Sequence, residues 1–121
     1  MDRRAIGQHA EDAAARFLEQ QGLTIVLRNH RCRMGELDLI ASLPPDVLVI
    51  AEVRLRSRLD YGGAAASVDA RKRARILRAS RHLLATHPPL ARLRVRFDVI
   101  ELQPSPDAGY RIGWIRNAFD T

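Results

Sequence analysis

Residues 36–56, "ELDLIASLPPDVLVIAEVRLR", decide the fold because two apolar segments flank a pair of prolines. Residues 36–41 alternate like a β-strand, whereas residues 47–55 are longer and more apolar, which is typical of a central strand. The prolines between them end the first strand and shape a turn. We therefore expect an antiparallel hairpin about Pro45, in which Asp38 and Glu52 face each other.

Two facing carboxylates require a compensating cation. Cross-strand neighbours lie about 5 Å apart between Cβ atoms, and like charges at that distance repel. One source of positive charge is Arg54, which shares a strand face with Glu52. Another is Mg²⁺, which prefers oxygen ligands and takes one or two carboxylates. Glu11 is a candidate third acid, so the residues alone leave open an ion network bridged by Arg54 or a metal site.

The segments around this hairpin predict the rest of the fold. Helical spacing of apolar residues appears twice, and further apolar runs resemble strands. The expected order is α-β-β-β-α-β-β in a single domain, residues 1–121, with a mixed five-stranded sheet in an α/β sandwich. The remaining elements are expected as helices over 7–21 and about 68–86 and strands over 23–29, 93–102 and 110–115, with a turn over 30–35.

The charge balance favours a polyanionic partner. The chain has 20 basic and 14 acidic residues, for a net charge of +6. All but one of the basic residues are arginines, the exception being Lys72, and arginine suits bidentate phosphate contacts. A codon bias toward arginine is an alternative explanation of the composition. The charge therefore points to nucleic acid without establishing it.

Other composition signals exclude several classes of protein. Cys32 is the only cysteine, which excludes a disulfide framework and a cysteine-based zinc cluster. The N-terminal segment lacks the apolar region of a secretory signal, and no run has the length of a membrane span. We expect a cytoplasmic protein with no membrane partner. The four histidines, at positions 9, 30, 82 and 87, lack metal-ligand spacing and receive no role.

Two motifs in the chain resemble a nuclease signature. "GELDLIA" (35–41) and "EVRLR" (52–56) resemble the PD-(D/E)xK pattern, with Asp38, Glu52 and Arg54 at its acid, acid and lysine positions and Leu37 at its proline. With "VDARKRARIL", "RFDVI" and "IRNAF", they resemble the YraN-like family of predicted bacterial endonucleases. This resemblance implies a restriction-endonuclease-like three-layer sandwich, similar to Holliday junction resolvases. It also implies Mg²⁺ or Mn²⁺ held by Glu11, Asp38 and Glu52.

The arginine at the lysine position bears on the mechanism. Arginine does not deprotonate in proteins, so Arg54 cannot act as a general base, but it can stabilise charge on a phosphate. One hypothesis is a metal-dependent endonuclease that hydrolyses DNA phosphodiester bonds, including those of branched or structured DNA. The alternative is a non-catalytic nucleic-acid-binding module with a degenerate site. A basic interaction protein without a nucleic-acid role is a third possibility.

Several basic residues are candidates for nucleic-acid contacts. Lys72 lies at the edge of the buried stripe of its helix, so we expect it to point toward the sheet, as a second cation near the phosphate. A lysine that snorkels at the helix boundary is the simpler alternative. No small-molecule cofactor is expected. The candidate nucleic-acid-binding residues are Arg54, Arg56, Arg71, Lys72 and Arg75.

Overall fold

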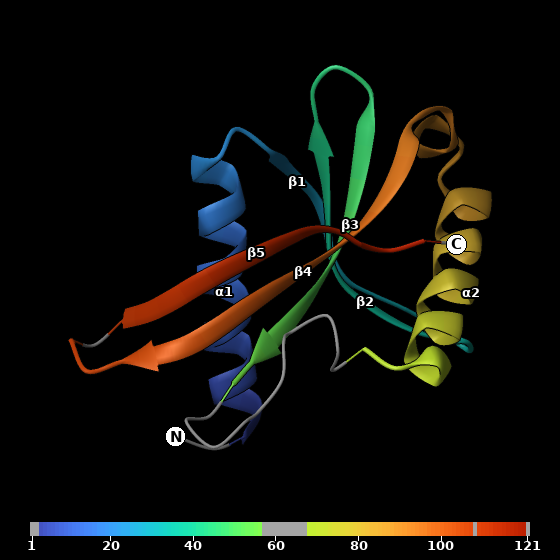
Figure 1. The fold of residues 1–121 in the computed structure, drawn as a ribbon. Coiled ribbons are helices and arrows are strands. Elements are labelled where there is room, and N and C mark those ends of the chain that lie inside the picture. The colour runs from blue at the N-terminus through green and yellow to red at the C-terminus, as the bar shows by residue number, and fades with distance from the viewer. Residues whose placement is uncertain (1–2, 57–67, 108, 121) are drawn as a thin grey trace.

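The computed structural model describes residues 3–56, 68–107 and 109–120, which form an α/β sandwich (Figure 1). The order of helices and strands is the predicted α-β-β-β-α-β-β, with one short 3-10 helix added before the fourth strand. The elements are α1 (Arg3–Gln20), β1 (Thr24–Cys32), β2 (Gly35–Leu43), β3 (Val47–Leu55), α2 (Ala70–Thr86), η2 (Pro88–Arg92), β4 (Arg94–Ser105) and β5 (Gly109–Phe119).

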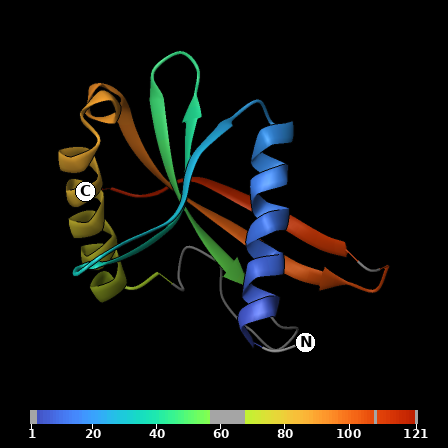
Figure 2. The ribbon, with the colours of Figure 1, turned by 180° about the vertical axis from the view of Figure 1, so that it is seen from behind.

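The sheet is mixed and five-stranded, as predicted. Its strands lie in the order β1-β2-β3-β4-β5, so each strand pairs with its neighbour in sequence. Three pairs are antiparallel, and the β3–β4 pair is parallel because α2 returns the chain to the starting edge. Figures 1 and 2 show α1 and α2 on opposite sides of the sheet. The fold is therefore the predicted three-layer arrangement, consistent with a nuclease-like fold.

Each face of the sheet carries its own apolar core. Alternation along β3 sends Val49 toward α1 and Ile50 toward α2, and both side chains are buried. Leu18 of α1 and Leu83 of α2 are fully buried in these two cores. Burying one such side chain contributes about 1.5–3 kcal/mol. Burial on both faces explains why residues 47–51 are continuously apolar.

The predicted turn over residues 30–35 is wrong in its length. β1 continues to Cys32 and β2 begins at Gly35, with these two residues paired across the ladder. Gly35 has a φ of 152°, a conformation that side chains strongly disfavour, and this lets the chain reverse within two residues. Polar residues such as His30 therefore lie in a strand, because the glycine turn and the packing of the sheet override their low strand propensity.

Helix α2 begins where Asp69 caps it. The Asp69 carboxylate accepts a hydrogen bond from the backbone N–H of Lys72 at 2.9 Å, which satisfies one of the free donors of the first turn. This cap fixes the helix start directly beside β3.

Among the described residues, no helix is both long and apolar enough to cross a membrane.

Candidate active site

The hairpin of β2 and β3 has the predicted register. Leu39 pairs with Ala51 and Ile40 with Ile50, and the ladder ends at that point. Asp38 and Glu52 follow as the next opposed positions. The Asp38 carboxylate accepts the N–H of Val53 at 2.8 Å, so its side chain leans across to β3. The two acids thus meet where the two strands separate.

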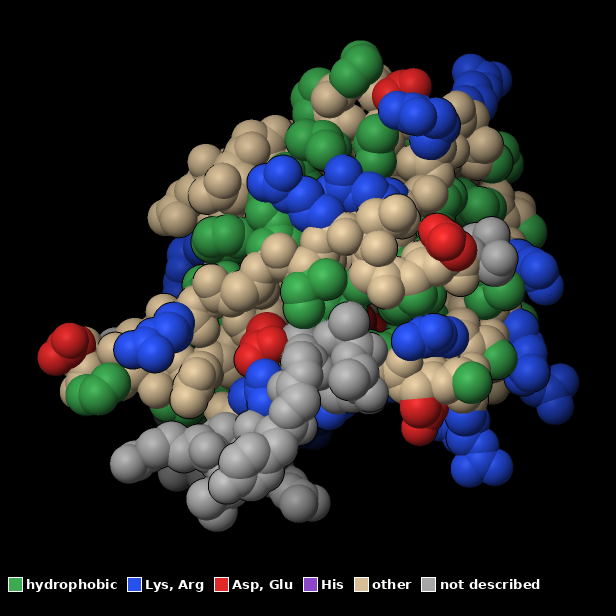
Figure 3. All heavy atoms as spheres, viewed as in Figure 1, with side chains coloured by type: hydrophobic (Ala, Val, Ile, Leu, Met, Phe, Trp, Pro, Cys, Tyr) green, Lys and Arg blue, Asp and Glu red, His purple; other side chains and the backbone are tan. Residues whose placement is uncertain are grey.

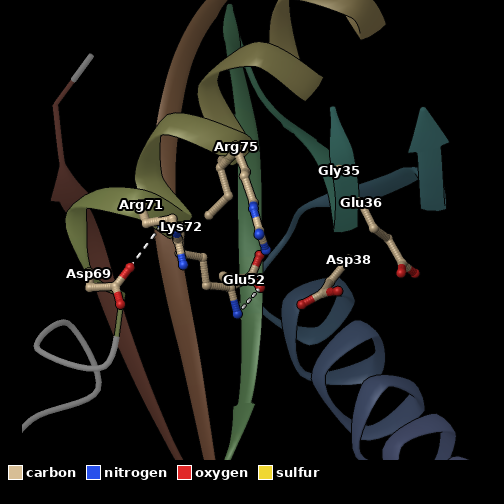
Figure 4. A pocket seen from close by; sticks show the side chains of 9 residues that line it. Gly35, Glu36, Asp38, Glu52, Asp69, Arg71, Lys72 and Arg75 are labelled. Carbon is tan, nitrogen blue, oxygen red and sulfur yellow. Dashed lines mark hydrogen bonds and ion pairs between the residues drawn. The ribbon is translucent and has the colours of Figure 1, made fainter. Parts of the chain in front are cut away.

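Lys72 supplies the cation at this point. Its Nζ lies 2.8 Å from Oε1 of Glu52, whose side chain is only 9% exposed. Figure 4 shows Lys72 reaching from the first turn of α2 toward β3, with Asp38 beside the pair. The expectation that Lys72 points toward the sheet is confirmed. A buried carboxylate is costly unless it is paired, so this contact offsets the cost of burying Glu52.

The acids and Lys72 line a pocket of about 480 Å³ between β2, β3 and the start of α2. Arg71 and Arg75, both predicted to contact nucleic acid, also line it. Glu36 lies in the pocket as well, although the sequence analysis assigned it no role. Its position two residues before Asp38 was an available signal, because alternate residues of a strand share a face. The complete lining is Gly35, Glu36, Asp38, Glu52, Asp69, Arg71, Lys72, Arg75 and Ile76.

Asp38 is poorly stabilised as an anion. Burial is the largest cause that raises its pKa, followed by the charge of Glu52; the Val53 N–H and Lys72 only partly oppose this rise. The resulting pKa is about 7. One lysine therefore does not fully compensate two carboxylates. Another cation near Asp38 would favour its ionised form.

Glu11 approaches this pair from α1. Its Oε1 is buried without a hydrogen-bond partner in the described part of the chain, and it lies 3.5 Å from Nη2 of Arg28. Arg28 is held more closely by Asp12, at 2.6 Å. Burial, and then the charge of Asp38, raises the pKa of Glu11. Glu11 is thus near Asp38 without lining the pocket, and its role as a ligand stays a prediction.

Arg54, the arginine of β3, does not pair with the acids. Among the described residues, Arg54 forms no ion pair with Asp38 or Glu52 and does not line the pocket. The alternative in which Arg54 bridges the two acids is therefore wrong, since Lys72 makes the contact with Glu52. Arg56 also lies outside the pocket lining, and its Nη1 contacts Oε1 of Glu101 at 2.6 Å.

A row of exposed arginines extends from the pocket along α2. We call Arg71, Arg75, Arg78 and Arg81 the α2 basic edge; all four are exposed. Figure 3 shows basic side chains projecting on the side of the molecule where α2 lies. Arg73 is not part of the α2 basic edge, because its guanidinium makes contacts within the protein. Its Nε donates to the carbonyl of Val68 at 2.8 Å, and the group lies over the Phe119 ring.

The donor set fits an ion that prefers oxygen ligands. Asp38 and Glu52 provide adjacent carboxylates, and Oε1 of Glu11, which accepts no hydrogen bond in the described residues but pairs with Arg28 at 3.5 Å, is a third oxygen nearby. Across the described residues, no three His, Cys, Asp or Glu side chains already converge on one point. Mg²⁺ and Mn²⁺ suit such a site, because Mg²⁺ is commonly held by one or two carboxylates, with water and phosphate in the other positions.

Comparison with known proteins places the chain in a family. Residues 10–102 match the model described as "Uncharacterised protein family UPF0102". A UPF0102 protein of Alcanivorax borkumensis is 47% identical over 113 residues, which cover 93% of this chain and 90% of that protein. A UPF0102 protein of Nitrosomonas europaea is also 47% identical, over 94% of this chain and 92% of its own length. The chain therefore belongs to UPF0102, the YraN-like family that its motifs resemble.

Proposed function

We propose that this protein is a metal-dependent endonuclease that hydrolyses DNA phosphodiester bonds, including those of branched or structured DNA. The observation that carries the proposal is the meeting of Asp38, Glu52 and Lys72 in one pocket beside the α2 basic edge. Two carboxylates and an ammonium match the chemistry of phosphodiester hydrolysis. The protein's proposed site of action is the cytoplasm.

Asp38 and Glu52 would hold Mg²⁺ or Mn²⁺ through their carboxylate oxygens. Such an ion supplies Lewis-acid stabilisation of the phosphate and lowers the pKa of a bound water. The Asp38 side chain lines the pocket and is held by the Val53 N–H. The Glu52 side chain is almost buried and is held by Lys72, so it has little freedom to move. Both carboxylates are thus oriented before substrate binds.

Lys72 would take over the charge-stabilising role of the motif lysine. Its side chain is 34% exposed while the ammonium contacts Glu52, so the flexible stem can also reach a phosphate in the pocket. An ammonium that hydrogen-bonds a phosphate oxygen stabilises the charge that develops during hydrolysis. Arg54 would contact the DNA backbone outside the pocket, as a fixed cation rather than as a base.

The α2 basic edge would position the duplex. Four exposed guanidinium groups on one helix form a surface of like charge that adjoins the pocket. Arginine binds phosphate oxygens in bidentate geometry, and such contacts fix the register of the backbone without reading its sequence. Each contact releases counterions, so we expect the DNA affinity to fall steeply with salt.

A non-catalytic nucleic-acid-binding module is the second candidate. One observation favours it: Lys72 already occupies one face of Glu52, while arginine stands at the motif lysine position. If the ammonium never leaves Glu52, the pocket would lack a carboxylate for the ion. The same α2 basic edge would then bind DNA without cutting it.

Cleavage assays separate the two candidates. Wild type, Asp38→Asn and Lys72→Met are incubated with linear, single-stranded, flap and four-way-junction DNA, with Mg²⁺, Mn²⁺ or EDTA. Glu36→Gln is the matched control, because it removes an exposed carboxylate of the same pocket. We expect cleavage only with metal, and a loss of at least 100-fold in Asp38→Asn but not in Glu36→Gln.

The outcomes are distinct for each candidate. Cleavage by Asp38→Asn equal to that of wild type would exclude the proposed catalytic site. An inactive wild type that binds DNA equally in EDTA, together with an active Arg54→Lys variant, would support the binding module. Affinity for DNA that does not change between low and high salt would argue against both candidates.

A further inference from the structure

Three histidines, one from β1 and two from the end of α2 and just after it, gather at the end of α2 opposite the pocket. His30 lies on β1, His82 in the last turns of α2, and His87 just after that helix. The ring centroids of His30 and His82 are 5.3 Å apart, and those of His30 and His87 are 5.9 Å apart. His82 follows Lys72 by ten residues, or about 15 Å along the helix axis. The cluster is therefore separate from the carboxylate pocket.

Two imidazole nitrogens of this cluster face each other. Nε2 of His30 lies 3.2 Å from Nδ1 of His82, and both side chains are partly buried. This separation is at the long end of the range for a hydrogen bond. Two nitrogens bound to one tetrahedral zinc ion, each at about 2.0–2.1 Å, are about 3.3–3.4 Å apart. The pair thus has nearly the bite distance of a zinc chelate.

The surroundings hold the pair in place. His87 keeps its Nδ1 within 3.2 Å of the carbonyl of Leu83, and its ring stands nearly perpendicular to that of His30, at 80°. The His30 ring is therefore packed between two others and cannot turn freely. The packing of the three rings therefore keeps the His30 and His82 nitrogens close together.

Local charge favours a cation at this position. The C-terminal end of a helix carries partial negative charge, which attracts cations within its last turn. Arg78 lies one turn before His82 and Arg81 directly precedes it, but both are exposed and can keep their guanidinium groups in water. The opposing effect of these two arginines is therefore small.

We propose that His30 Nε2 and His82 Nδ1 form a binding site for a borderline-soft divalent ion such as Zn²⁺, linking β1 to α2. No third His, Cys, Asp or Glu of the described residues converges on this point, so water completes the coordination. Imidazole ligands suit Zn²⁺, whereas the carboxylate pocket suits Mg²⁺. The site is independent of the proposed nuclease activity.

Zinc titration of the tag-free protein tests the proposal. Calorimetry gives the affinity for ZnCl₂, and thermal unfolding is measured with ZnCl₂ or MgCl₂. An ion that binds only the folded state raises Tm by about 10 °C at a hundredfold excess over Kd. We expect this rise with zinc in wild type and at least a tenfold loss of zinc affinity in His30→Gln and in His82→Gln.

Two matched variants serve as controls. His9→Gln removes a histidine on α1, and Asp38→Asn removes an acid of the carboxylate pocket; both should keep the zinc-dependent rise in Tm. Ring-nitrogen NMR of the wild type gives a readout that does not depend on how variants fold, and zinc should shift His30 Nε2 and His82 Nδ1. Equal zinc affinity in all variants, loss of binding in Asp38→Asn, or unshifted resonances of these two nitrogens would overturn the proposal.

Discussion

Replacing Asp38 with asparagine should stabilise the metal-free protein at high pH. The pKa of Asp38 is about 7 in the folded protein, against an ordinary value of 3.8, chiefly because of burial and then the charge of Glu52. The folded state therefore holds its proton over a pH range in which the unfolded state has released it. Because the folded pKa is the higher one, wild-type stability falls as pH rises from about 4 to about 7.

The magnitude follows from the difference between these two values. At 1.36 kcal/mol per pKa unit, the rise from 3.8 to about 7 corresponds to a cost of about 4 kcal/mol above pH 7. Asparagine does not titrate, and its side-chain oxygen can still accept the Val53 N–H. We expect Asp38→Asn to be about 2–4 kcal/mol more stable than wild type at pH 8, with a much smaller difference at pH 4.

Urea unfolding at several pH values measures this difference, in buffers with EDTA. Glu36→Gln, which removes an exposed acid of the same pocket, should stay within about 0.5 kcal/mol of wild type. A difference between wild type and Asp38→Asn that is the same at pH 4 and pH 8 would refute the reasoning. Millimolar Mn²⁺ should raise the stability of wild type at pH 8 and leave that of Asp38→Asn unchanged.

Three further changes test other contacts of the structure. Lys72→Met should cost about 1–3 kcal/mol in urea unfolding because it leaves Glu52 buried without its partner, and Lys72→Met combined with Glu52→Gln should recover part of that loss. Asp98→Ala should cost about 3–5 kcal/mol by the same assay. This fully buried carboxylate accepts the Trp114 indole N–H at 2.8 Å and two N–H groups of the Arg96 guanidinium. Arg75→Ala should weaken DNA binding and reduce the slope of log affinity against log salt by about one, measured by fluorescence anisotropy.

The sheet could be predicted because local signals and packing agree there. Alternation in residues 36–41, the apolar run after Pro45 and the two prolines all indicate one hairpin, and its register follows from them. The turn before Gly35 was less predictable. Polar residues of β1 resemble a loop in sequence, and only the pairing of Cys32 with Gly35 places them in a strand. Strand propensity is overridden there by tertiary context.

The candidate site was predictable only as far as strand geometry determines it. Asp38 and Glu52 follow from the register, but the partner of Glu52 does not. Arg54 is the nearest cation in sequence. However, residues two positions apart on a strand are about 7 Å apart, and their side chains extend side by side from the same face instead of toward each other. The ammonium of Lys72 reaches Glu52 from a helix packed over the strand. The histidine cluster could not be predicted for the same reason, because His30 and His82 are 52 residues apart and only tertiary packing brings them together.

Under the proposed function, the choice between hydrolysis and binding depends on Lys72 rather than on Arg54. Glu52 is buried and needs a cation at all times, which Lys72 supplies in the metal-free protein. In the proposed mechanism, an ion beside Asp38 would also compensate Glu52, and the ammonium of the partly exposed Lys72 side chain would become available for a phosphate. Wild type and Arg54→Ala should then gain nearly the same stability from the ion. Lys72→Met should gain markedly more, because only the ion can compensate Glu52 in that variant. Equal effects of the ion on all three proteins would show that Lys72 and the ion do not share Glu52.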